Sequence, residues 1–382
     1  MIFNKDVTGI EISGIRKFYN MIADKENVIS LTIGQPDFPT PEHIKNAAKE
    51  AIDNNFTSYS HNAGYIELRK AVSMWMKNKY NLQYNAENEI TVHAGSSQAL
   101  DVAFRAILNP GDEVILPAPI YPGYEPLIKL SKATPVLVDT TDSDFKITPE
   151  LIETYMTKKT KAVVIPYPSN PTGAVLSESE TAELALYLKD KDLFVISDEL
   201  YSELVFDSNH YSIAGYPNMK KKTIIITGLS KSHSMTGWRL GVALSSKPII
   251  EQMIKVHQYN IACATTISQK AGIQAYTHGY DDALPMKEAY QRRMENAYQR
   301  LTKLGLELDK PKGTFYMFPK VPFIKSTSFD LALDIVNKVG VALVPGTAFS
   351  KYGEGYLRLS CACSDDELEE GLYRLEKYFK RY

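Results

Sequence analysis

Cysteine is scarce in this 382-residue sequence, which contains only Cys263, Cys361 and Cys363. An odd number of cysteines, two of them separated by one residue, fits neither a disulfide framework nor a zinc site. The sequence also lacks an apolar run long enough to cross a bilayer, and its first residues lack the pattern of a signal peptide. We therefore expect free thiols and a cytoplasmic protein.

An excess of charge is also missing, because 43 basic residues stand against 45 acidic ones, for a net charge of −2. No basic stripe or acidic tail is visible, so the composition gives no sign of nucleic-acid binding. His61 has no second ligand at metal-site spacing, which favours a polar loop residue over a metal ligand. We expect no metal, nucleic-acid or membrane partner.

The sequence does contain short apolar runs that alternate with helical patterns. This alternation predicts an α/β fold with a mostly parallel sheet of seven strands, covered by helices on both faces. The runs lie at 89–92, 113–116, 135–138, 162–166, 193–197, 223–227 and 240–244. We expect a large domain at 41–284, a smaller α+β domain at 285–382, and an N-terminal segment, 1–40, that packs on the small domain.

Candidate chemistry gathers where these strands end. Lys231 follows the run 223–227, and burial there would lower its pKa and make its amine a nucleophile, although a lysine on a solvated face is the ordinary alternative. Ligands of parallel sheets bind outside the carboxyl ends of the strands. The other polar residues that follow strand ends are Tyr121, Asn170, Asp198 and Tyr201, so we expect them in one cleft.

A turn of small residues, His93 to Ser97, joins the run 89–92 to a predicted helix. Its backbone N–H groups and the helix dipole would suit a phosphate, whereas a plain tight turn is the alternative. A lysine amine, a phosphate turn, a carboxylate and arginines at one sheet edge suggest a cofactor that carries an aldehyde and a phosphate. Pyridoxal 5′-phosphate has both groups.

Along essentially its whole length the chain resembles the class I/II aminotransferases of fold type I, which are pyridoxal-phosphate enzymes. The motifs that carry this resemblance occur in a specific order and spacing. They are the stretches 30–38 (SLTIGQPDF), 59–68 (YSHNAGYIEL), 109–114 (NPGDEV), 168–173 (PSNPTG), 197–201 (SDELY), 229–241 and 356–360 (YLRLS).

The resemblance implies roles for residues around the cofactor ring. Lys231 would form the Schiff base and then act as base and acid of a 1,3-proton shift. Asp198 would hold the pyridinium nitrogen, and Tyr201 and Asn170 would hydrogen-bond the phenolic oxygen. Tyr121 would stack on the ring face; the alternative for it is a core aromatic.

The resemblance also implies how the phosphate and the substrate are bound. The implied phosphate ligands are Gly95, Ser96, Ser97, Ser230 and Arg239. Many relatives carry a serine where this chain has Gly228, which leaves the number of phosphate contacts open. Arg358 would clamp the substrate α-carboxylate, helped by Asn170 and the backbone of Gly34.

A homodimer with shared active sites is implied by Tyr59, which matches the tyrosine that reaches the phosphate of the neighbouring subunit.

Stretches such as EISGIRKF and KVHQYN resemble the branch of N-acetyl-L,L-diaminopimelate aminotransferases of lysine biosynthesis, which use glutamate or 2-oxoglutarate as co-substrate. A broad aromatic or aspartate aminotransferase and a cystathionine carbon–sulfur lyase are the alternatives. A regulator domain is disfavoured, because the sequence starts directly with the aminotransferase pattern and has no basic region.

Overall fold

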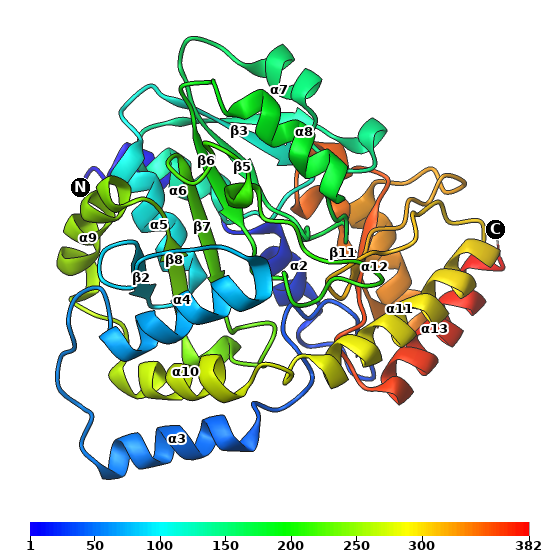
Figure 1. Ribbon diagram of the computed structural model, residues 1–382. Helices are drawn as coiled ribbons and strands as arrows, with labels where there is room; N and C mark the ends of the chain where they lie inside the picture. The colour runs from blue at the N-terminus through cyan, green and yellow to red at the C-terminus, as the bar shows by residue number, and fades with distance from the viewer. Residues whose placement is uncertain (382) are drawn as a thin grey trace.

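A computed structural model describes residues 1–381 of the chain. Its central sheet has seven strands in the order β2-β8-β7-β6-β5-β3-β4 (Figure 1). All neighbouring strands are parallel except β8, which is antiparallel to both β2 and β7, so the predicted mostly parallel sheet is confirmed. The strands are β2 (Ile90–His93), β3 (Glu113–Ala118), β4 (Thr134–Asp139), β5 (Thr160–Ile165), β6 (Phe194–Asp198), β7 (Thr223–Gly228) and β8 (Gly241–Leu244).

Helices cover both faces of this sheet, which explains why its strands are apolar throughout. In β7, Ile224 and Ile226 pack into one core with α5 (Ser96–Ile107), α6 (Tyr124–Leu130) and α9 (Lys247–Ile261). The intervening Ile225 faces the opposite core. The helices on that face are α3 (Glu42–Asp53), α4 (Ile66–Tyr80), α7 (Pro149–Tyr155), α8 (Glu178–Leu188) and α10 (Thr266–His278).

The C-terminal elements form a separate core, to the right of the sheet in Figure 1. Its helices and strands are α11 (Leu284–Lys303), β9 (Tyr316–Met317), α12 (Ser328–Val339), β10 (Val341–Ala342), β11 (Val344–Pro345), β12 (Leu357–Ser360) and α13 (Asp365–Phe379). Phe18 and Ile22 of α2 (Gly14–Ile22) are buried in this core, and β1 (Ile29–Ser30) pairs with β10. The N-terminal segment therefore lies against these C-terminal elements, while the domain limits at residues 40 and 284 stay a prediction.

Local features define the boundaries of several elements. The first amphipathic helix begins at Gly14 with Ser13 as its N-cap, and a short helix, α1 (Lys5–Thr8), precedes it. Strand β1 has two residues, because its partner β10 offers only two residues for pairing. Helix α9 extends to Ile261, since His257 keeps its buried face in phase.

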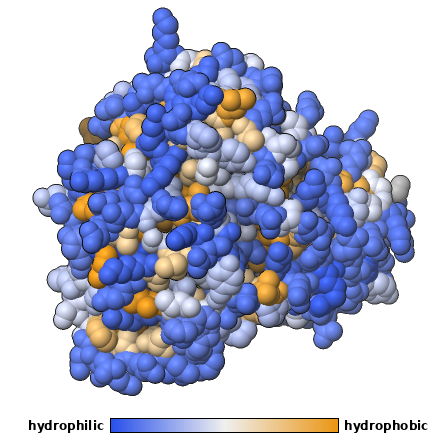
Figure 2. Space-filling view, in the orientation of Figure 1, coloured by the Kyte–Doolittle hydropathy of each residue, from blue (hydrophilic) through white to orange (hydrophobic). Residues whose placement is uncertain are grey.

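The molecular surface carries few large apolar groups on the face shown in Figure 2, where hydrophilic residues predominate and the hydrophobic ones gather in small patches. Across the described chain the most exposed apolar side chains include Met1, Ile2, Phe3, Tyr59 and Tyr259. Among residues 1–381, no helix is both long enough and apolar enough to cross a membrane.

Candidate active site

The sheet topology brings the candidate residues to one edge. Asp198 ends β6, and Lys231 lies three residues beyond the end of β7. Strand β2 runs in the same direction as β7, because both are antiparallel to β8, so its carboxyl end delivers Gly95 to the same edge. Arg239 lies two residues before the antiparallel strand β8 and arrives at this edge from the other direction.

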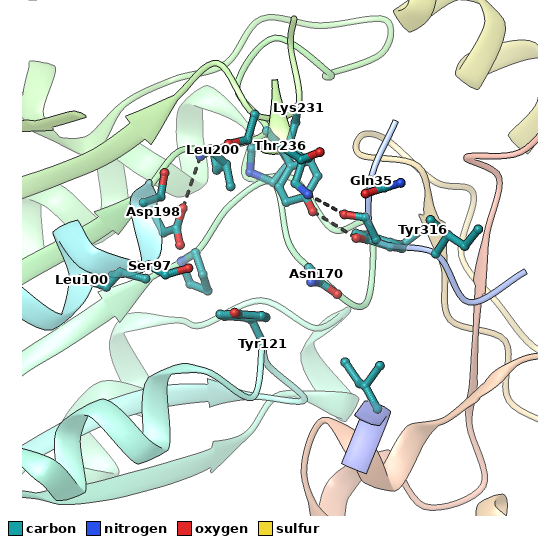
Figure 3. Close-up of a pocket in the computed structure, with 18 of the residues that line it drawn as sticks. Gln35, Ser97, Leu100, Tyr121, Asn170, Asp198, Leu200, Lys231, Thr236 and Tyr316 are labelled. Atoms are coloured by element: carbon teal, nitrogen blue, oxygen red, sulfur yellow. Dashed lines mark hydrogen bonds between the residues drawn. The ribbon is translucent and has the colours of Figure 1, made fainter. Parts of the chain in front are cut away.

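A cavity of about 430 Å³ opens at this edge (Figure 3). Eleven of the thirteen predicted site residues line it: Gly34, Ser96, Ser97, Tyr121, Asn170, Asp198, Tyr201, Ser230, Lys231, Arg239 and Arg358. Gly95 and Tyr59 do not line it. Within the described residues no group of His, Cys, Asp and Glu side chains could hold a metal ion.

Gly95 lies behind the cavity wall as the N-cap of α5, with a φ of +84° that favours glycine. A Cβ atom at this position would lie 2.3 Å from Nη2 of Arg239. The turn therefore has to be glycine for the guanidinium to reach the N-terminus of α5. Exposed N–H groups of a helix start beside an arginine form a suitable site for a phosphate.

Gly228, the position that departs from many relatives, is explained by close packing of β7 against β8. A Cβ atom there would lie 2.9 Å from the carbonyl oxygen of Leu240 and 3.2 Å from the Cα of Gly241. A serine at this position would have to displace backbone atoms of the neighbouring strand. Glycine at position 228 therefore allows this close approach of the two strands and supplies no side chain to the phosphate.

Lys231 is half-buried in the cavity wall, and its Nζ donates a hydrogen bond to the carbonyl oxygen of Gly34. Burial, reinforced by the positive charges of Arg358 and Arg239, lowers its pKa to about 8, and the Asp198 carboxylate only partly opposes this effect. About one tenth of the amine is then neutral at pH 7, against a negligible fraction for an ordinary lysine. The expected nucleophile is thus available near neutral pH.

The pH dependence of this amine can be measured. Because its pKa is lowered to about 8, the rate at which cofactor-free protein captures pyridoxal should rise about tenfold from pH 6 to pH 7 and level off above pH 8. Stopped-flow absorbance on the cofactor-free protein would follow this rate. A rate that keeps rising up to pH 10 would mean that Lys231 titrates like a solvated lysine.

Asp198 is half-buried, and its carboxylate has two polar partners. The hydroxyl of Tyr124 donates to its Oδ2 at 2.6 Å, and the N–H of Leu200 donates to its Oδ1 at 3.3 Å. Burial raises the pKa of Asp198, while these hydrogen bonds oppose the rise. A half-buried carboxylate is stabilised by a cationic partner, which is the property required of a group that holds a protonated ring nitrogen.

Arg358 on β12 is fully buried, and its guanidinium is held from two sides. Nη1 donates to Oδ1 of Asn170 at 2.9 Å, and Nη2 donates to the carbonyl oxygen of Thr32 at 2.7 Å. The guanidinium also lies over the ring of Tyr316, 4.3 Å from its centroid. Its buried Nε has no hydrogen-bond partner among the described residues, so a donor is left for a bound carboxylate.

The two predicted tyrosines differ in their surroundings. Tyr201 is buried, with its hydroxyl 3.1 Å from that of Tyr316, and burial raises its pKa. It lies in a turn closed by a hydrogen bond from Leu204 N–H to its carbonyl oxygen. Tyr121 presents its ring to the cavity from the side opposite Lys231 (Figure 3), as a stacking residue should.

Other lining residues are absent from the sequence-based prediction. Tyr124 and Tyr316 contact Asp198 and Tyr201, respectively, and Thr32 contacts Arg358. Tyr124 could have been found from the sequence, because it lies three residues after Tyr121 and begins the helix that Tyr121 precedes. The remaining wall is uncharged and includes Ile15, Ile33 and Gln35.

Comparison with known proteins agrees with this geometry. The family described as "Aminotransferase class I and II" matches residues 26–375. "Probable N-acetyl-LL-diaminopimelate aminotransferase" of Bacillus subtilis is 58% identical over 99% of this chain and 95% of its own length. An aspartate aminotransferase of Pyrococcus abyssi is 40% identical, with 96% of each chain covered. The crystal structure of an aromatic aminotransferase from Pyrococcus horikoshii superposes with a TM-score of 0.91 at 39% identity, covering 96% of this chain and 99% of that chain.

The chain belongs to the class I and II aminotransferases and is a pyridoxal-phosphate-dependent transaminase. The residues present fit this cofactor. The fit rests on the Gly95–Arg239 cradle, the half-buried carboxylate of Asp198, and a half-buried lysine whose pKa is about 8.

Proposed function

We propose that this aminotransferase acts on N-acetyl-LL-diaminopimelate, with glutamate and 2-oxoglutarate as the second pair of substrates, in the cytoplasmic synthesis of lysine. The observation that carries the proposal is the 58% identity to the Bacillus subtilis protein that bears this activity in its name. The aspartate aminotransferase named above is 40% identical.

The apolar part of the cavity wall suits this substrate. The charged residues that line the cavity are Asp198, Lys231, Arg239 and Arg358. All four are needed by the cofactor and by the α-carboxylate, so the rest of the wall in this chain is uncharged. The proposed substrate begins its side chain with three methylenes, which suit Ile15 and Ile33 in this uncharged wall.

Bound pyridoxal 5′-phosphate supplies a ring that accepts electrons from the carbon carrying the amino group. We propose that Lys231 holds its aldehyde, Asp198 its ring nitrogen, and Tyr121 its ring face. Asn170 turns its Oδ1 to Arg358 and so directs Nδ2 toward the phenolic oxygen, together with the hydroxyl of Tyr201. The phosphate would lie at the N-terminus of α5 against the following residues: Gly95, Ser96, Ser97, Ser230 and Arg239.

The proton transfers of the reaction fall to Lys231. Its Nζ, with a pKa of about 8, can accept a proton from the substrate carbon near neutral pH and return it to a neighbouring carbon. Arg358 would orient the amino acid by binding its α-carboxylate through Nε and Nη2, which fixes the carbon near this amine. The carbonyl of Gly34, which Lys231 contacts, lies on the substrate side of the cavity.

A substrate panel tests the proposal. Purified enzyme is assayed for glutamate formation from 2-oxoglutarate with N-acetyl-LL-diaminopimelate, unacetylated LL-diaminopimelate, aspartate and phenylalanine as amino donors. The proposal requires the highest kcat/KM for the acetylated compound. The apolar wall of Ile15 and Ile33 makes an aromatic donor the second candidate, and a preference for phenylalanine would replace the proposal by that function.

We further propose a homodimer in which Tyr59 completes the partner's phosphate site. Tyr59 is 86% exposed in the single chain and lies outside its cavity. Its loop is nevertheless ordered by hydrogen bonds, among them one from Asn62 Nδ2 to the carbonyl oxygen of Ala262 at 2.8 Å. A large aromatic side chain held on an ordered surface loop is suited to contact a second subunit.

Mixed dimers test this arrangement. Tyr59→Phe should weaken cofactor affinity about tenfold, because one hydrogen bond to a charged phosphate is lost. Co-expression of differently tagged Tyr59→Phe and Lys231→Ala chains should give a hybrid whose one functional site has wild-type affinity, since that site takes Tyr59 from the other chain. A functional site that keeps the weakened affinity would show that Tyr59 serves its own subunit.

A further inference from the structure

Gln98 lies beside the turn that leads into α5 but does not line the cavity. Its side-chain Oε1 accepts a hydrogen bond of 2.8 Å from the backbone N–H of Ala94. Ala94 directly precedes Gly95, the N-cap whose conformation brings the helix start against Arg239. The side chain of Gln98 therefore fixes the orientation of the peptide that enters this turn.

The other end of the Gln98 amide is held by α9. Its Nε2 lies 3.0 Å from Oδ1 of Asn260 and 3.3 Å from Nδ1 of His257. Because Oε1 already accepts from the backbone of Ala94, Nε2 must donate, and Nδ1 of His257 must accept. The orientation of the amide is thus determined from both ends.

His257 is in turn fixed by burial and packing. Its ring is fully buried and lies against the ring of His93 in a T-shaped arrangement, with 4.6 Å between centroids. Nε2 of His93 is 2.8 Å from the hydroxyl of Thr91 on the same strand. Burial lowers the pKa of His257, which keeps the imidazole neutral and leaves Nδ1 able to accept.

We propose that Gln98 and His257 are positioning residues for the cofactor phosphate. They hold the turn of Ala94 and Gly95 so that the first N–H groups of α5 point at the phosphate before it arrives. Neither residue needs to touch the cofactor, since the pair acts through the backbone. This inference rests on the proposed place of the phosphate at this turn.

The test compares two probes that differ only in the phosphate, pyridoxal 5′-phosphate and pyridoxal. Their dissociation constants are measured on cofactor-free full-length protein by fluorescence titration. Gln98→Met removes the hydrogen bonds to Ala94, Asn260 and His257 at nearly constant volume. It should weaken binding of pyridoxal 5′-phosphate about tenfold while changing binding of pyridoxal less than twofold. His257→Phe keeps a ring in place and should give the same phosphate-selective loss, to a smaller degree.

Gln274→Met is the matched control, because the side chain of Gln274 also donates to a histidine. Its Nε2 lies 3.2 Å from Nδ1 of His43, and this contact joins α10 to α3. It should leave both constants unchanged. Equal losses for the two probes in Gln98→Met, or no loss at all, would overturn the inference. Ser97→Ala separates the proposed place of the phosphate from the proposed role of Gln98. If Ser97→Ala weakens binding of the phosphorylated probe alone and Gln98→Met has no such effect, the phosphate site stands and the positioning role fails.

Discussion

Replacing Lys231 by alanine is expected to lower kcat by at least about 10⁴-fold, because one amine both holds the cofactor and carries the proton. Among the described residues that line the cavity, Lys231 is the only lysine, so no second amine can hold the cofactor. Asp198 is occupied by hydrogen bonds from Tyr124 and Leu200, and the guanidinium of Arg358 cannot act as a base. Single-turnover absorbance measurements with a saturating amino acid would give the rate of the chemical step.

Lys222 provides a matched control for this variant. It precedes β7 whereas Lys231 follows the end of the same strand, and burial lowers the pKa of both lysines. Lys222→Ala should therefore keep kcat within a few-fold of wild type. Borohydride reduction followed by peptide mapping should place a pyridoxyl group on Lys231 in this control and in wild type. A reduced adduct on a different lysine, or a Lys231→Ala enzyme with near-normal kcat, would contradict the proposed role.

The strands and the residues that end them were predictable because their signals are local. The run 223–227 places Ile224 and Ile226 on one face and Ile225 on the other, as burial on two faces requires, and Gly228 marks its end. Asp198 comes at the end of such a run and Lys231 soon after another, so a parallel sheet brings them to one edge. The membership in the aminotransferase family, which the motifs suggested, is confirmed.

The hydrogen-bonded surroundings of these residues were not predictable in the same way. Tyr316 reaches the cavity from β9, and it meets Tyr201 because both are buried in the same core, which the turn after β6 shares with the C-terminal elements. The N-terminal segment supplies Thr32 to Arg358 across 326 positions of sequence, which no periodicity reveals. The place of Tyr59 depends on a second subunit, so neither the sequence pattern nor a single chain tests it.

Arg358→Lys is expected to raise KM for the amino acid about 100- to 1000-fold and to change kcat much less. Lysine keeps the charge but loses the planar fork that binds Asn170 and Thr32 while Nε remains for the substrate. One or two hydrogen bonds to a carboxylate, each contributing about 1.5–3 kcal/mol, correspond to this loss in affinity. Steady-state kinetics with varied amino donor at saturating 2-oxo acid would measure it.

Arg300→Lys controls for the substitution itself, because Arg300 also binds two partners, Glu369 and Glu376, but joins α11 to α13 away from the cavity. It should leave KM unchanged. A second comparison isolates the carboxylate, since an amine that lacks the α-carboxylate cannot use the guanidinium. In wild type, KM for the amino acid should be lower than KM for this amine by the same factor by which Arg358→Lys raises KM for the amino acid. If the variant keeps the full preference, the α-carboxylate is bound elsewhere and the three contacts of Arg358 are structural.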